Sequence, residues 1–272
     1  MIFVKKMIFL LMLFIILSFG ICFGQSQKER LELRGPVKAV AEYSEVYRGE
    51  DRSEVLEKES RQYFFSEKGF LSRGIQDTKY VYCETYYDEK ERDIKQNFKT
   101  FTLETVYDDE GHTFQVFRHG EFYGYGTLDI AGRPLKTYTR ILTKDSNFRL
   151  KMLEKYDEQG NRIYWDFWIG PYGDASFHSR VEYDKNNRAT MSVSFSDGDE
   201  NKNRSQTYYQ YNEHQFVAKK MVKNEKGEMV FAKYDSEFKY EEIDSHGNWL
   251  KRISINHNEN KVKITTRKIQ YY

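Results

Sequence analysis

The sequence has few cysteines, few prolines and almost no net charge. Two cysteines and three prolines among 272 residues exclude a disulfide-braced scaffold and a proline-rich linker protein. The chain has 43 basic and 42 acidic residues, so it lacks the electrostatic footprint of a nucleic-acid-binding protein. Aromatic residues, in contrast, make up 17% of the chain, and disordered segments lack them. We therefore expect a folded protein with an aromatic-rich core.

Long apolar runs are also missing, except near the N-terminus. Lys5 and Lys6 precede an unbroken apolar run from Met7 to Leu17, and small residues follow at positions 18, 20, 22 and 24. This order is typical of an export signal, and the run is short for a membrane span. We predict a signal peptide over residues 1–24 that leaves Gln25 as the first residue, with an uncleaved anchor as the alternative. The mature protein would then be periplasmic, on the outer-membrane surface or secreted, with no transmembrane segment.

Cys22 opens a second interpretation of the same segment. A bacterial lipoprotein signal has a small residue directly before the acylated cysteine, and here that position is Ile21. Cys22 is therefore a candidate lipidation site with a poor match to the pattern. In either case only Cys83 remains after processing, so no disulfide forms within the chain, and we expect Cys83 to be a small buried apolar residue.

A short motif recurs through the rest of the chain: an aromatic residue, Asp or Asn, two polar residues, then Gly or Asn. Asp or Asn can bond to its own backbone two residues on, and Gly or Asn accepts a positive φ, so the motif predicts a hairpin turn. Successive copies are 20 to 32 residues apart, enough for one hairpin each. We align them on Gly69, Glu91, Gly111, Gly132, Gly160, Asn187, Gln215 and Gly247.

The segments between the turns alternate like half-buried strands. Met191, Val193 and Phe195 alternate with polar neighbours, and the segment from Val37 to Tyr43 has apolar residues at every second position. We interpret Asp51–Ser60 as a polar excursion between strands. The predicted fold class is all-β, an array of antiparallel β-hairpin repeats. It would be a coiled single sheet or solenoid, or a partly closed barrel, in which neighbouring repeats stack. No linker is evident, so residues 25–272 are predicted to form one repeat domain.

Several repeat families resemble these segments. Tyr156–Arg162 resembles the YD repeat of Rhs-type surface and toxin shells, which implies long antiparallel sheets that coil into a wrap. Tyr63–Leu71 resembles the choline- or glucan-binding wall repeat, and Gly120–Leu128 resembles a MORN unit; both imply hairpins. Leu33–Lys38 and Asp244–Arg252 resemble uncharacterised exported repeat proteins of Bacteroidetes and spirochaetes. These resemblances agree on architecture and differ on function.

Motifs for catalysis and cofactors are missing. The six histidines lack helical zinc spacing, and His112, His214 and His246 occupy repeat turns, where we expect them to be solvated. No nucleophile elbow, phosphate loop or dinucleotide fingerprint is present, so no cofactor is expected. Carboxylates are plentiful, which leaves a glycosidase-like pair open. Four of them share the same turn position and are predicted to be structural: Asp88, Asp108, Asp157 and Asp184.

One loop resembles the start of a calcium site. Oxygen-bearing side chains stand at alternate positions, which can converge on one hard cation. Lys202 replaces the glycine that such loops need. The candidate ligands, with a solvated loop tip as the alternative, are Asp197, Asp199, Asn201 and Asn203.

An aromatic stripe is the main binding candidate. On a strand, Tyr164 and Trp168 share one face and Trp165 and Phe167 share the other. We expect the Tyr164 face to be the better buried. The stripe is either a strand covered on both sides or an exposed platform for sugar rings or a protein partner. Its residues are Tyr164, Trp165, Phe167, Trp168 and Tyr172.

These features predict a non-enzymatic exported protein of the cell envelope, or a secreted one, that binds a polymer, a surface or a protein partner. The alternative is an exported glycosidase-like hydrolase with an acidic site on a sheet face. A concave spot that gathers two carboxylates outside the turns would favour the alternative.

Overall fold

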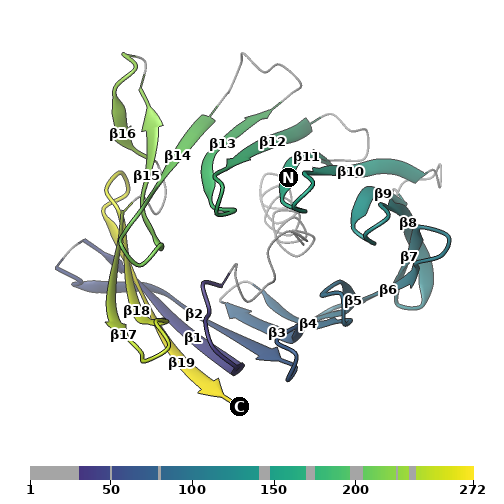
Figure 1. Ribbon diagram of the computed structural model, residues 1–272, viewed down its shortest axis with the longest axis horizontal. Coiled ribbons are helices and arrows are strands. Elements are labelled where there is room, and N and C mark those ends of the chain that lie inside the picture. Colours follow the sequence, from purple (N-terminus) through teal and green to yellow (C-terminus); the bar gives the residue numbers. More distant parts are fainter. Residues whose placement is uncertain are drawn as a thin grey trace. The chain divides into compact units, whose positions relative to one another are not determined.

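The computed structural model describes residues 31–49, 51–78, 81–140, 148–169, 175–196, 205–224, 226–232 and 237–272. Within these residues the chain forms strands and no helix (Figure 1), which confirms the all-β prediction. Accordingly, this part of the chain contains no helix able to cross a membrane. The strands are β1 (Val37–Arg48), β2 (Glu54–Phe65), β3 (Leu71–Thr78), β4 (Tyr82–Tyr87), β5 (Asp93–Phe98), β6 (Thr102–Asp108), β7 (Thr113–Arg118), β8 (Glu121–Leu128), β9 (Pro134–Arg140), β10 (Phe148–Tyr156), β11 (Arg162–Ile169), β12 (Ala175–Tyr183), β13 (Ala189–Ser196), β14 (Ser205–Tyr211), β15 (Val217–Lys223), β16 (Met229–Phe231), β17 (Glu237–Ile243), β18 (Trp249–Asn256) and β19 (Lys261–Tyr271).

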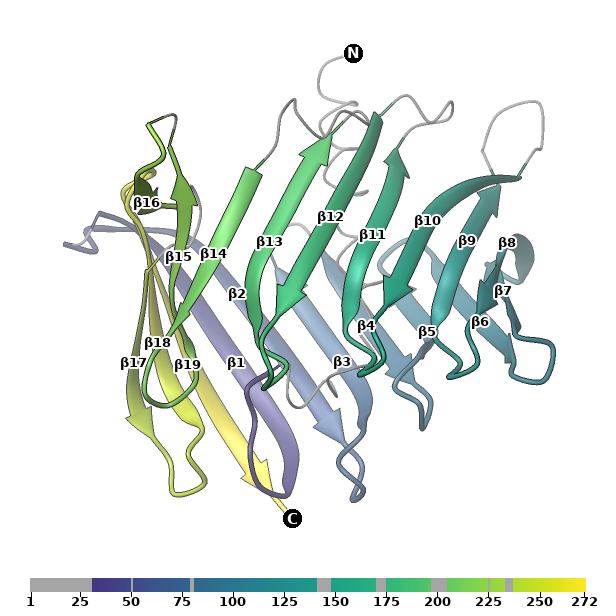
Figure 2. The same ribbon diagram turned by 45° about the horizontal axis from the view of Figure 1, so that its top comes forward.

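Contacts group the chain into two compact units. In the central unit, which includes residues 103–180, β6 to β12 pair antiparallel in chain order; Figure 2 shows β10, β11 and β12 side by side. The terminal unit contains both ends of the described chain. In it β5, β4, β3, β2, β1, β19, β18 and β17 follow one another, all antiparallel, and β15 pairs with β14, β16 and β17.

The repeated motif forms one recurring turn. In the turn that starts at Asp129, its backbone N–H donates to the carbonyl of Arg133, and the N–H of Gly132 donates back to Asp129, both at 2.9 Å. The same pair of bonds, at 2.8–3.0 Å, closes the turns that start at Ser66, Asp88, Asp157, Asp184, Asn212, Asn224 and Asp244. The fourth residue of each turn has a positive φ, as predicted at seven of the eight aligned positions: Gly69, Glu91, Gly132, Gly160, Asn187, Gln215 and Gly247.

The copy aligned on Gly111 is the exception, and its predicted role was wrong. Asp108 pairs with Thr113 across the turn, and the positive φ, 52°, belongs to His112. The physical reason is the reach of the aspartate. Asp108 Oδ1 accepts from the N–H of Gly111, three residues on, whereas Asp129 Oδ1 accepts from residues two and four positions on. This shift moves the left-handed position along by one residue.

The interpretation of Asp51–Ser60 as an excursion between strands was also wrong, because β2 begins at Glu54. Its charged side chains are accommodated by charged partners on β1. Lys58 Nζ lies 2.8 Å from Glu45, and Arg48 Nε lies 2.9 Å from Glu54. Cross-strand pairs of opposite charge support a strand whose composition alone disfavours it.

The buried face of β1 carries Val40, Glu42 and Ser44, so two polar residues are buried on it. Glu42 and Ser44 are buried, whereas Tyr43 is 46% exposed. Glu42 is tolerated because Arg267 of β19 donates to it at 2.8 Å, and Ser44 bonds Thr265 at 2.9 Å. The opposite face of β1 therefore presents the half-buried Ala39 and Ala41 beside the exposed Tyr43.

Each unit buries its own apolar side chains. In the terminal unit Trp249 is fully buried, with the guanidinium of Arg267 3.3 Å from the ring centroid, and its Nε1 donates to Glu32 at 2.8 Å. The buried apolar residues of the central unit include Leu103, Phe114, Val116, Leu128, Met152 and Phe167.

Candidate functional site

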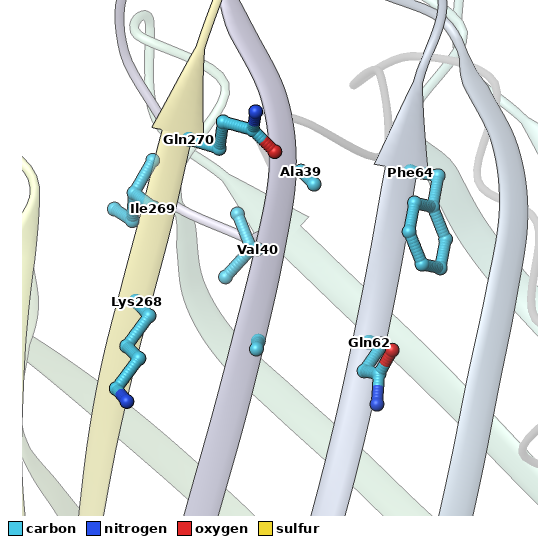
Figure 3. Close-up of a pocket in the computed structure, with 8 residues that line it drawn as sticks. Ala39, Val40, Gln62, Phe64, Lys268, Ile269 and Gln270 are labelled. Atoms are coloured by element: carbon cyan, nitrogen blue, oxygen red, sulfur yellow. The ribbon is translucent and has the colours of Figure 1, made fainter.

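A shallow groove of about 240 Å³ lies on the exposed face of β1. Ala39 and Ala41 form its floor. The pairing registers set two rows across it, Phe64–Ala39–Gln270 and Gln62–Ala41–Lys268. Figure 3 shows Ala39 between Gln270 of β19 and Phe64 of β2. The hollow forms because the short side chains of Ala39 and Ala41 lie between the longer side chains of β2 and β19.

The groove is lined mostly by apolar side chains, with three polar ones, Gln62, Lys268 and Gln270. It combines one ammonium group, two carboxamides and one aromatic ring, and holds no carboxylate. Each carboxamide both donates and accepts hydrogen bonds. The guanidinium of Arg73 lies 5.3 Å from the Phe64 ring centroid. Tyr43, the next outward-facing residue of β1 after Ala41, is 46% exposed. The groove suits a negatively charged ligand that also has apolar surfaces able to lie on aromatic rings.

A second pocket, of about 210 Å³, is lined with charges. It gathers Glu57 and Glu59, two strand carboxylates outside the turns, which is the arrangement that would favour a hydrolase. Glu59, however, lies 2.7 Å from Lys263, and Glu259 lies 2.7 Å from Lys261. A glycosidase pair needs one carboxyl group that stays protonated. Lysines that neutralise two of the three carboxylates favour an ion-pair network instead.

The aromatic stripe lies on β11 of the central unit. Tyr164, Trp165 and Trp168 are half-buried, and Phe167 is buried. Cations lie over two of the half-buried rings, those of Tyr164 and Trp165. The Lys155 ammonium lies 5.0 Å and the Arg180 guanidinium 5.7 Å from the Tyr164 centroid, and Arg162 lies 5.5 Å from that of Trp165. The expectation that the Tyr164 face is the better buried is not confirmed, because Phe167 lies on the opposite face.

The other predicted sites lie largely outside the described residues. These are the signal peptide with Cys22, the last stripe residue Tyr172, and the calcium candidates Asp197, Asp199, Asn201 and Asn203. In the part of the chain that the structure describes, no cluster of three or more His, Cys, Asp or Glu side chains could hold a metal ion.

Cys83 is buried, as predicted. Burial raises the pKa of its thiol, and Thr85 Oγ1 lies 3.6 Å from the sulfur. A raised pKa keeps the thiol protonated and inert. His112, His214 and His246 are exposed, as expected of turn residues.

Reasoning from the sequence missed the groove. Its signal was the alternation of Ala39 and Ala41 with Val40 and Glu42, which does not by itself tell which face is buried. Only the buried partner of Glu42 on β19 reveals the side on which the alanines lie.

No family model matches the chain, and no curated protein sequence matches it. Solved structures similar to it include a porin-like protein from Bacteroides uniformis, 11% identical, with a TM-score of 0.39 over 87% of this chain and 99% of that one. A putative outer membrane lipoprotein-sorting protein domain from Vibrio parahaemolyticus is 8% identical, with a TM-score of 0.27 over 90% of each chain. A LolA superfamily protein from Nitrosomonas europaea is 10% identical, with a TM-score of 0.28 over 89% of each chain. TM-scores this low do not place the chain in the fold family of any of these proteins.

Proposed function

We propose that this protein is exported to the cell envelope and binds an acidic polysaccharide in the groove on β1. The observation that carries the proposal is the lining: one ammonium group and two carboxamides around an alanine floor, without a carboxylate. Lys268 attracts a carboxylate on the ligand, and Gln62 and Gln270 bond its hydroxyl groups. The lining offers no acid–base pair, so the groove binds its ligand without changing it.

The aromatic residues favour a polymer over a single sugar. Tyr43 stands four residues from Ala39 on β1, about 13 Å along a strand that rises about 3.3 Å per residue. Phe64, in the row of Ala39, and the exposed ring of Tyr43 thus lie near opposite ends of one strip. A chain of several sugar rings can contact both. Export rests on the predicted signal peptide over residues 1–24.

The test is titration calorimetry of the protein with polygalacturonate, with a neutral glucan as the comparison ligand. We expect Ala41→Leu, which fills the groove, and Lys268→Glu, which reverses its charge, each to weaken binding of the acidic polymer at least tenfold. Binding should also weaken as salt is added, because salt screens exposed charges. Lys268 is exposed, so its variant should retain the fold, which circular dichroism checks.

Ala131→Leu is the matched control, since Ala131 is an exposed alanine in a turn. It should bind as the unmodified protein does. The proposal is wrong if the unmodified protein binds neither polymer, if it binds both equally, or if the folded Lys268→Glu variant keeps full affinity for polygalacturonate.

A further inference from the structure

Three side chains with complementary chemistry meet on one face of the β11–β12 pair. Asp166 stands opposite His178, and Trp168 stands opposite Ser176. His178 Nδ1 makes a short hydrogen bond with Asp166 Oδ1, and His178 Nε2 lies 2.9 Å from Ser176 Oγ. Residues two apart on a strand share a face, so the register brings Ser176, His178 and Asp166 into one line.

The hydrogen-bond chemistry determines which group donates and which accepts along Ser176, His178 and Asp166. An ionised carboxylate only accepts, so Asp166 requires a proton on Nδ1 of His178. In the neutral ring Nε2 then carries the lone pair and accepts the hydroxyl proton of Ser176. This is the order in which a serine is activated as a nucleophile: carboxylate, imidazole, hydroxyl.

Packing restricts the imidazole to this position. The ring of His178 stacks on that of Phe195 of β13, with centroids 4.7 Å apart and planes 13° apart. The side chains of His178 and Asp166 are 11% and 8% exposed, so little water competes for their hydrogen bond. Ser176 is half-buried at the end of the line.

The same face suggests the class of substrate. The indole of Trp168, directly across from Ser176, offers an apolar surface beside the hydroxyl. Arg180, which stands opposite Tyr164, lies four residues from Ser176 on the same strand, about 13 Å away at about 3.3 Å per residue. An ester with an apolar acyl chain and a more distant anionic group matches these positions.

We propose that Ser176 is the nucleophile, His178 the general base and Asp166 the orienting carboxylate of a site that hydrolyses carboxylic esters of apolar acyl chains. Ser176 Oγ attacks the ester carbonyl carbon while His178 Nε2 takes the hydroxyl proton. The bond to the alkoxy oxygen breaks, and His178 returns the proton to the leaving alcohol. Water then attacks the acyl-serine with His178 as base, releasing the carboxylic acid and restoring the serine hydroxyl. This activity is separate from the groove on β1.

The test is covalent labelling with a fluorophosphonate probe, with the modified residue located by peptide mass spectrometry. We expect the unmodified protein to be labelled at Ser176 and to hydrolyse a p-nitrophenyl acyl ester. Ser176→Ala should abolish both. His178→Asn keeps an amide N–H for Asp166 and removes the base, so labelling and hydrolysis should slow at least about a hundredfold.

Ser194→Ala, at an exposed serine on β13, is the matched control and should change neither rate. Circular dichroism and thermal unfolding establish that each variant is folded. A purely structural Asp166–His178 pair predicts an unlabelled native protein, and that result overturns the proposal. Labelling that survives in Ser176→Ala, or equal rates in folded His178→Asn, also overturns it.

Discussion

At the scale of single residues, each recurring turn is held by hydrogen bonds between the residue that opens it and the residue four positions further on. The hydrogen bond from Arg188 lowers the pKa of Asp184, so this bond contributes stability above the ordinary carboxyl pKa and loses it as pH falls through the lowered value. Arg188 also lies 4.9 Å from the ring centroid of Tyr211, and Arg133 lies 4.6 Å from that of Tyr156, each ring 23 residues further on. One arginine thus closes its own turn and contacts the aromatic residue before a later turn.

Glu91 and Gln215 are two of the non-glycine turn residues with a positive φ, and these two positions should respond oppositely to glycine. Gln215→Gly relieves a left-handed backbone, φ 68°, and loses only an exposed hydrogen bond from Arg188. It should therefore stabilise the protein by up to about 1 kcal/mol. Glu91→Gly relieves φ 57° but removes the carboxylate that accepts from the buried N–H of Leu71 at 2.7 Å. It should destabilise by about 1–3 kcal/mol. Urea unfolding of both variants measures the change in the free energy of unfolding. Changes of the same sign would contradict the different roles given to Gln215 and Glu91.

At the scale of elements, the position of a residue on a strand decides whether it is buried more than its apolar character does. β11 is aromatic on both faces, yet among its residues 162–168 the buried ones are Asp166 and Phe167. Asp166 is held by His178, and Phe167 stands between Met152 and Phe177 in the neighbouring strands. The two half-buried tryptophans have polar neighbours: the Arg162 guanidinium lies over the ring of Trp165, and Trp168 stands opposite Ser176.

This difference predicts unequal losses along β11. Phe167→Ala should destabilise the protein by about 3–5 kcal/mol, because it leaves a cavity between packed side chains. Trp168→Ala, at a half-buried site opposite Ser176, should cost clearly less. Denaturant unfolding of both variants provides the comparison. Equal and large losses would mean that both faces of the strand are core.

At the scale of the whole chain, the first and last strands are joined. β1 pairs with β19 along its length, and the pairing includes the buried contact of Glu42 with Arg267, 225 residues apart in sequence. The Arg267 side chain is 3% exposed and also covers Trp249. A buried ion pair of this kind matters most when one partner is lost, since the other charge then remains without compensation.

Arg267→Met should therefore destabilise the protein by about 3–5 kcal/mol, and adding Glu42→Met should recover much of that loss. A double-mutant cycle in urea measures the coupling. Lys58→Met removes the exposed partner of Glu45, which lies on β1 like Glu42. As the control it should leave the free energy of unfolding nearly unchanged, because exposed ion pairs contribute little. Additive effects of the two buried substitutions would show that the pair is not coupled.

The sequence by itself determined the all-β class and seven of the eight aligned turns, with the structural role of their aspartates. The interactions that form a turn, such as those between Asp129 and Arg133, span five residues, so their signal is local. Only the tertiary structure decided which face of β1 is buried and that Ser176, His178 and Asp166 meet. Both depend on register, which local pattern cannot fix: a bulge after Val37 shifts β1 by one residue, and the pairing of β11 with β12 sets Asp166 opposite His178. A shift of one residue exchanges the faces of a strand, and the partner that makes Glu42 a buried residue is on the last strand of the chain.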